Sequence, residues 1–206
     1  EYFLGQVTIY NHQKTFASNE NDAQENDLIA QIYRDSLLQC KEVPSNVRAF
    51  MSAPTLLFHK KYDNAIHILD SVYESYAPYS RDAGIIAYSL ASAYQGKNDS
   101  ENMIKYFAIS AISDVLNGAR ENLSLKILAK LIFESGDIDR AYKYMKNAME
   151  DAILCNARIN TIEASDMYLF IDKAFQEKEK NKFITITILL VALCFVCILL
   201  CALFIQ

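Results

Sequence analysis

A pattern of small and apolar residues recurs every 38 residues through the middle of the chain. Aligning the sequence on itself at this offset superimposes four sets of positions: Ala53, Ala91 and Ala129; Leu56, Tyr94 and Ile132; Ala65, Met103 and Ala141; and Leu69, Phe107 and Met145. A block of this length cannot bury its own apolar face, so successive blocks must stack on one another. The register therefore predicts an all-α solenoid of helical hairpins over residues 45–155.

Each block is expected to contain two helices joined by a short turn. Residues 96–99 (Gly-Lys-Asn-Asp) and 136–137 (Gly-Asp) form the turns of the second and third blocks. Glycine tolerates the positive φ that commonly ends a helix, so we expect Gly96 and Gly136 to hold that conformation. The aspartate after each glycine is expected to cap the next helix at its positive end.

The first block departs from this pattern. Residues 60–63 fill the turn without a glycine, and Pro54 falls inside the first helix of the pair. An interior proline costs about 3 kcal/mol. We therefore expect Ser52 to cap a shortened helix, with Pro54 in its first turn.

The segments that flank the repeats are also expected to be largely helical. Residues 1–44 are predicted to hold a helical remnant (1–10), a polar loop (13–25) and an amphipathic helix (26–38). Residues 156–182 are predicted to form a capping helix and a juxtamembrane linker.

Residues 183–205 contain no charged side chain. This segment would extend over roughly 34 Å as an α-helix, enough to cross a hydrocarbon core of about 30 Å. We therefore expect a single transmembrane helix. Cys194, Cys197 and Cys201 share one face of it, where they are expected to act as small packing residues, possibly against a second copy of the chain, rather than as metal ligands.

Charge and cysteine patterns leave orientation and redox state open. Lys178, Lys180 and Lys182 precede the span and lean toward a cytoplasmic soluble part, but this rule needs the count on both sides. Cys40 and Cys155 could pair in an oxidising compartment, and their spacing does not decide it.

No catalytic constellation is visible in the sequence. The five glycines are isolated, so there is no phosphate-binding loop, and the three histidines lack the spacing of a zinc site. We therefore expect no enzyme activity, no cofactor and no metal. The net charge of −5 argues against nucleic-acid binding by this segment.

Two stretches resemble the tetratricopeptide repeat. Leu90-Ala91-x-x-Tyr94 is followed by a Gly/Asn-Asp turn, Met103 and Phe107, and the next block repeats this pattern from Leu128. The family implies a concave surface, lined by the first helix of each pair, that binds peptides or protein segments. By this analogy the inward positions are Tyr88, Ser92 and Gln95 in one repeat and Lys126, Lys130 and Phe133 in the next.

Residues 119–176 resemble the sensor portion of a family of membrane-bound transcriptional regulators from Bacteroidota. The resemblance rests on the GD-x-x-RAY-x-Y and ED-A-x-x-CNAR stretches and on the span that follows. It implies periplasmic repeats, one inner-membrane span and a cytoplasmic DNA-binding half beyond this chain.

Two functions are consistent with these features. The first is a sensor domain that binds a protein, a peptide or a glycan-related ligand and signals across the membrane. The second is a membrane-tethered scaffold that recruits protein partners without signalling.

Overall fold

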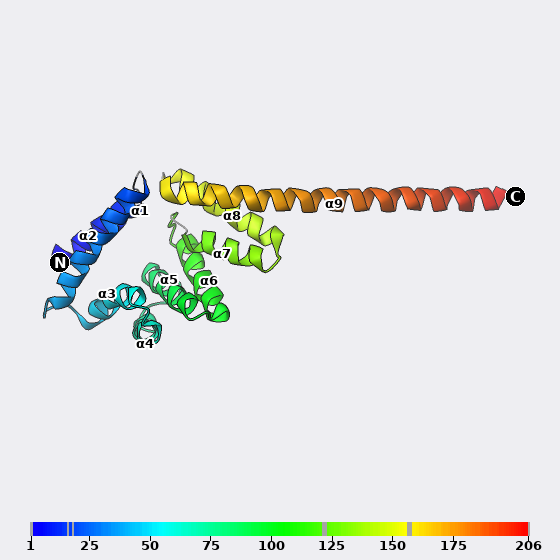
Figure 1. Ribbon diagram of the computed structural model, residues 1–206. Helices are drawn as coiled ribbons and strands as arrows, with labels where there is room; N and C mark the ends of the chain where they lie inside the picture. The colour runs from blue at the N-terminus through cyan, green and yellow to red at the C-terminus, as the bar shows by residue number, and fades with distance from the viewer. Residues whose placement is uncertain (1, 16, 18, 121–122, 156–157, 206) are drawn as a thin grey trace.

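The computed structural model describes residues 2–15, 17, 19–120, 123–155 and 158–205, and all regular secondary structure within them is α-helical. The helices follow one another along the chain as α1 (Tyr2–Thr15), α2 (Glu20–Gln39), α3 (Ser45–Phe58), α4 (Tyr62–Tyr73), α5 (Arg81–Gly96), α6 (Ser100–Leu116), α7 (Leu123–Glu134), α8 (Ile138–Leu154) and α9 (Arg158–Ile205). Consecutive helices pack as hairpins along an arc, and α9 leaves the arc as a long rod (Figure 1). The all-α solenoid predicted from the sequence is confirmed.

The 38-residue register corresponds to the buried seam of this solenoid. The matching alanines Ala53, Ala91 and Ala129 are completely buried, and this lets paired helices approach closely. Leu69, Phe107 and Met145 are also completely buried and fill the space between neighbouring hairpins. Stacking therefore creates the core that no single hairpin possesses.

The turns keep the same register, but not at the expected residue. Positive φ angles occur at Lys60 (56°), Asn98 (59°) and Gly136 (90°). The prediction was right for Gly136 and wrong for Gly96, which is the last helical residue of α5. Gly96 has a different role, because a Cβ there would lie 2.2 Å from the ring of Tyr62.

The aspartate caps are confirmed. The Asp99 carboxylate accepts a hydrogen bond from the Asn102 backbone N–H at 3.1 Å, and Asp137 accepts one from Arg140 at 3.1 Å. These contacts, with others to the same residues, hold the pKa of both carboxyl groups below its usual range. Lys61 occupies the same position before α4 and provides no side-chain cap.

Helix α3 corrects the prediction for the first block. It begins at Ser45 after Pro44 and contains Pro54 in its interior. Ser52 is therefore not a cap, and its hydroxyl donates to the carbonyl of Ala49 at 2.7 Å within the helix. The prediction failed because the solenoid packing of α3 outweighs the local cost of the proline.

The polar loop predicted over residues 13–25 is also wrong, because only a short connection separates α1 from α2. Asn19 caps α2 by accepting a hydrogen bond from the Asp22 N–H at 2.9 Å. The polar residues that suggested a loop lie on the exposed face of the first turns of α2. Helix α2 is joined to α3 by Arg48, whose guanidinium donates to the carbonyls of Leu38 and Cys40.

A partly buried carboxylate, Asp70, lies among tyrosines between α4, α5 and α6. The Tyr106 hydroxyl donates to Asp70 at 3.4 Å, and the ring of Tyr106 stacks on Tyr94 at 5.6 Å. Burial, followed by the charge of Asp70, raises the pKa of Tyr106 to about 12. Burial also raises the pKa of Asp70, and the long hydrogen bond from Tyr106 only partly offsets it.

This arrangement predicts a pH dependence of stability. The folded chain holds a proton on Asp70 more tightly than the unfolded chain, so the contribution of Asp70 to stability increases as the pH falls through its raised pKa toward 3.8. We expect Asp70→Asn to be at least as stable as the wild type at pH 7, with the difference shrinking as the pH falls to that value. Thermal melts across this range measure it. A variant that is less stable than the wild type at pH 7 would show that the charged form is favoured instead.

Helix α9 combines the predicted capping helix, linker and span in one uninterrupted element. Its first part packs on α8 through the fully buried Ala164 and Ile171. A window of 18 residues further along has mean hydropathy 3.1, and none of it is buried. It is the one helix in the described part of the chain that is long and apolar enough to cross a membrane.

Candidate interaction groove

The first helices of the three repeat hairpins, α3, α5 and α7, carry the positions predicted to line a groove. Helices α3 and α5 contact each other directly. A small cavity of about 60 Å³ lies between them, lined by Phe50, Tyr76, Asp82, Ile85 and Ile86. The packing of α3 against α5 thus leaves a shallow, mostly apolar recess.

The three predicted residues on α5 differ in how available they are. Tyr88 is half-buried, and its ring meets Phe107 edge-on at 5.6 Å, so much of it belongs to the core. The Ser92 hydroxyl donates to the carbonyl of Tyr88 at 3.0 Å. Gln95 is exposed. Gln95 is therefore the most accessible of the three to a bound molecule.

The three predicted residues on α7 form a basic and aromatic row. Lys126 is half-buried and Lys130 is exposed, and both lie on the same side of the helix one turn apart. The Lys130 ammonium lies 4.0 Å from Glu134, a solvent-exposed pair that restrains it little. The half-buried ring of Phe133 meets Phe170 of α9 edge-on at 5.4 Å.

The sequence reasoning missed the matching positions on α3. Moving back by 38 residues from Tyr88, Ser92 and Gln95 gives Phe50, Pro54 and Leu57, all half-buried. The repeat register was sufficient to find them, but the groove was not extended to the first block. The row is therefore apolar at α3 and basic at α7.

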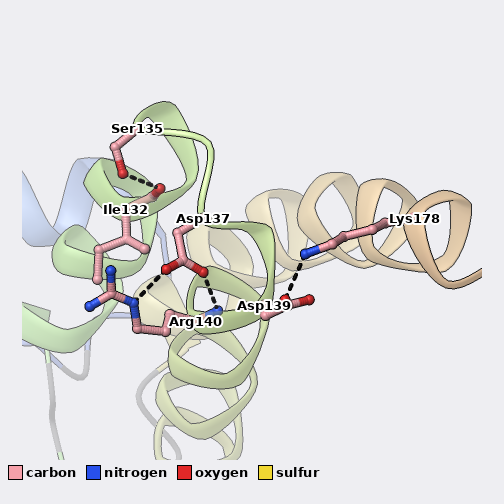
Figure 2. Close-up of polar contacts among 6 residues, drawn as sticks. All are labelled: Ile132, Ser135, Asp137, Asp139, Arg140 and Lys178. Carbon is pink, nitrogen blue, oxygen red and sulfur yellow. Dashed lines mark hydrogen bonds and ion pairs between the residues drawn. The ribbon is translucent and has the colours of Figure 1, made fainter. Parts of the chain in front are cut away.

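The last hairpin clamps α9 close to the apolar segment. Figure 2 shows the Lys178 ammonium of α9 at 2.6 Å from the Asp139 carboxylate at the start of α8. In the same view, Asp137 accepts a hydrogen bond from the side chain of Arg140 at 2.6 Å. The hydrogen bond from Lys178 to Asp139 raises the pKa of the lysine.

Aromatic contacts continue this clamp deeper between α8 and α9. The rings of Tyr142 and Phe175 stack at 4.1 Å with an interplanar angle of 3°. Tyr144 points to a different side of α8 and packs near Leu125. The hairpin thus holds α9 from Ala164 to Lys178, five residues before the apolar segment begins at Phe183.

The remaining chemistry-bearing side chains do not gather into a centre. Among the described residues no group of three or more histidine, cysteine or acidic side chains is arranged to hold a metal ion. Cys40 and Cys155 are half-buried free thiols. The side chain of His12 lies outside the described residues.

The fold and the groove define a class of protein: a membrane-associated tetratricopeptide-repeat interaction domain with one candidate transmembrane helix. The model of the SusR N-terminal TPR domain family matches residues 1–166. The chain belongs to this family, and SusR is a regulator of Bacteroidota. Comparisons with curated proteins and with solved structures find no match.

Proposed function

We propose that the chain is the non-enzymatic sensor part of a single-pass membrane regulator, in which an occupied groove shifts the transmembrane helix. The contact between Phe133 and Phe170 carries this proposal, because Phe133 belongs to the groove row and Phe170 belongs to α9. An occupant that displaces Phe133 acts directly on the helix that enters the membrane. The pair Asp139–Lys178 then limits how α9 can respond.

The groove row favours a peptide or protein segment with two chemically different halves. The α3 end offers Phe50, Pro54 and Leu57 to apolar side chains. The α7 end offers Lys126 and Lys130 to carboxylates. We therefore propose an occupant with an apolar half and an acidic half.

We further propose that the repeats lie in the periplasm and that the span crosses the inner membrane. The support is membership of the SusR N-terminal TPR domain family, together with the resemblance to regulators whose sensor lies outside the membrane and whose DNA-binding half lies inside. The lysines before the span favour the reverse orientation only weakly, because Glu177 and Glu179 lie among them.

A single tryptophan tests the link between groove and span. The chain has no tryptophan, so Phe170→Trp provides a unique fluorophore beside Phe133. The full chain in lipid nanodiscs is titrated with a synthetic peptide that has a leucine-rich half and a glutamate-rich half. We expect a saturable change in emission. The control is Leu169→Trp, whose parent side chain is equally exposed (63% against 62%) but is directed away from the groove.

The outcomes separate the sensor from the scaffold. An emission change in Phe170→Trp, without one in Leu169→Trp, supports the sensor. Peptide binding by fluorescence anisotropy without any emission change contradicts the proposed coupling and favours a scaffold. Absence of peptide binding contradicts the proposed occupant.

A further inference from the structure

One face of α9 has no partner in the soluble part of the molecule. The opposite face, with Ala164, Ile171 and Phe175, packs on α8. At about 100° per residue, Ile162 and Leu169 lie on the side away from α8. They are 61% and 63% exposed, which is unusual for two large apolar residues exactly one heptad apart.

The same face continues into the apolar segment without a break in the helix. Residues at seven-residue spacing from Ile162 form one line: Ile162, Leu169, Gln176, Phe183, Leu190 and Cys197. A second line runs beside it: Asp166, Lys173, Lys180, Thr187, Cys194 and Cys201. Two such lines are the d and a positions of a left-handed coiled coil.

The charges beside this seam complement a second copy in parallel orientation. Lys173 and Lys180 occupy a positions, and Asp172 and Glu179 immediately precede them at the g positions. In a parallel pair, a lysine at a reaches the acidic g residue of the partner helix. Polar a positions reduce stability but fix the register and the number of strands.

The membrane itself imposes the parallel orientation. Two copies of a single-pass chain enter the bilayer from the same side and at the same depth, so each residue meets its own counterpart across a twofold axis. Thr187, Cys194 and Cys201 are small enough for the helices to approach closely within the lipid. The repeats lie along one side of α9 and leave the seam open for this contact (Figure 1).

We propose that a second copy of this chain packs in parallel along the Ile162–Cys201 face of α9, from the soluble region into the membrane. The seam is formed by the two heptad lines above, and the repeats of the two copies lie on its outer sides. This inference is independent of what the groove binds.

Cysteine cross-linking in native membranes tests the seam. The full chain carries Cys40, Cys155, Cys194, Cys197 and Cys201 replaced by alanine, and single cysteines are then introduced. Lys180→Cys lies in the seam, and its neighbour Asn181→Cys is equally exposed but about 100° away. Leu169→Cys and Phe170→Cys form a second pair of this kind. Copper-phenanthroline oxidation is followed by non-reducing electrophoresis.

We expect at least about fivefold more covalent dimer from each seam cysteine than from its neighbour, as the closer approach of a and d positions requires. Dilution with an excess of cysteine-free chain should reduce the dimer in proportion. Equal cross-linking within each pair, a reversed preference, or no dimer from either seam cysteine would overturn the proposal. The peptide titration in nanodiscs is unaffected by these outcomes, so the two proposals fail separately.

Discussion

Replacing Phe107 by alanine is expected to lower the free energy of unfolding of the repeats by about 3–5 kcal/mol. Phe107 is completely buried at the centre of the largest core cluster and supports the edge-on ring of Tyr88. Deleting its ring removes apolar contact and leaves a cavity between two hairpins. Urea denaturation of the full chain in nanodiscs, followed by circular dichroism, measures the loss.

Phe58→Ala is the matched control, because Phe58 is 71% exposed at the end of α3. A surface substitution of this kind should change the free energy of unfolding by no more than about 0.5 kcal/mol. Equal losses in the two variants would mean that the 38-residue register does not mark the core.

Reversing the charge of both groove lysines is expected to weaken binding of the acidic peptide by roughly 30-fold or more at low salt. Lys126→Glu together with Lys130→Glu places like charges opposite the glutamates of the peptide. The effect should shrink in high salt, because exposed charges are screened. Fluorescence anisotropy of labelled peptide measures the dissociation constant.

Lys143→Glu with Lys146→Glu provides the same change of charge on exposed positions of α8. We expect this control to bind the peptide nearly as well as the wild type. If both double variants lose affinity to the same extent, the peptide responds to net charge and not to the groove.

The repeat architecture was predictable because its period is set by packing. Ala91 and Phe107 recur in register since every hairpin must bury the same seam against its neighbour. The aspartate caps were predictable for a local reason, as a carboxylate beside a helix start satisfies free N–H groups. These features depend on one hairpin or on adjacent ones.

The errors occurred where local composition and packing disagree. Pro54 suggested a shortened helix, but α3 continues through it from Ser45. Gly96 suggested the turn residue, whereas Asn98 takes the positive φ and Gly96 makes room for Tyr62. Asparagine adopts this conformation more readily than most residues, so the position two residues after the glycine was a usable signal.

The contacts between the groove and α9 could not be read from the sequence. The groove row follows from the register, including the missed residues Phe50 and Leu57 on α3. The pairs Phe133–Phe170 and Asp139–Lys178 depend on the path of α9 across the last hairpin. That path is set by tertiary packing on α8, which no repeat spacing specifies.

The central claim is that a repeat sensor outside the inner membrane is continuous with the helix that crosses it. The most direct measurement is the accessibility of a cysteine at Asn147, an exposed position of α8, in a chain that lacks its native cysteines. Intact cells are treated with a charged maleimide that crosses the outer membrane but not the inner one. We expect Asn147→Cys in the membrane fraction to be labelled in intact cells as fully as after lysis. Labelling only after lysis would place the repeats in the cytoplasm and contradict the account.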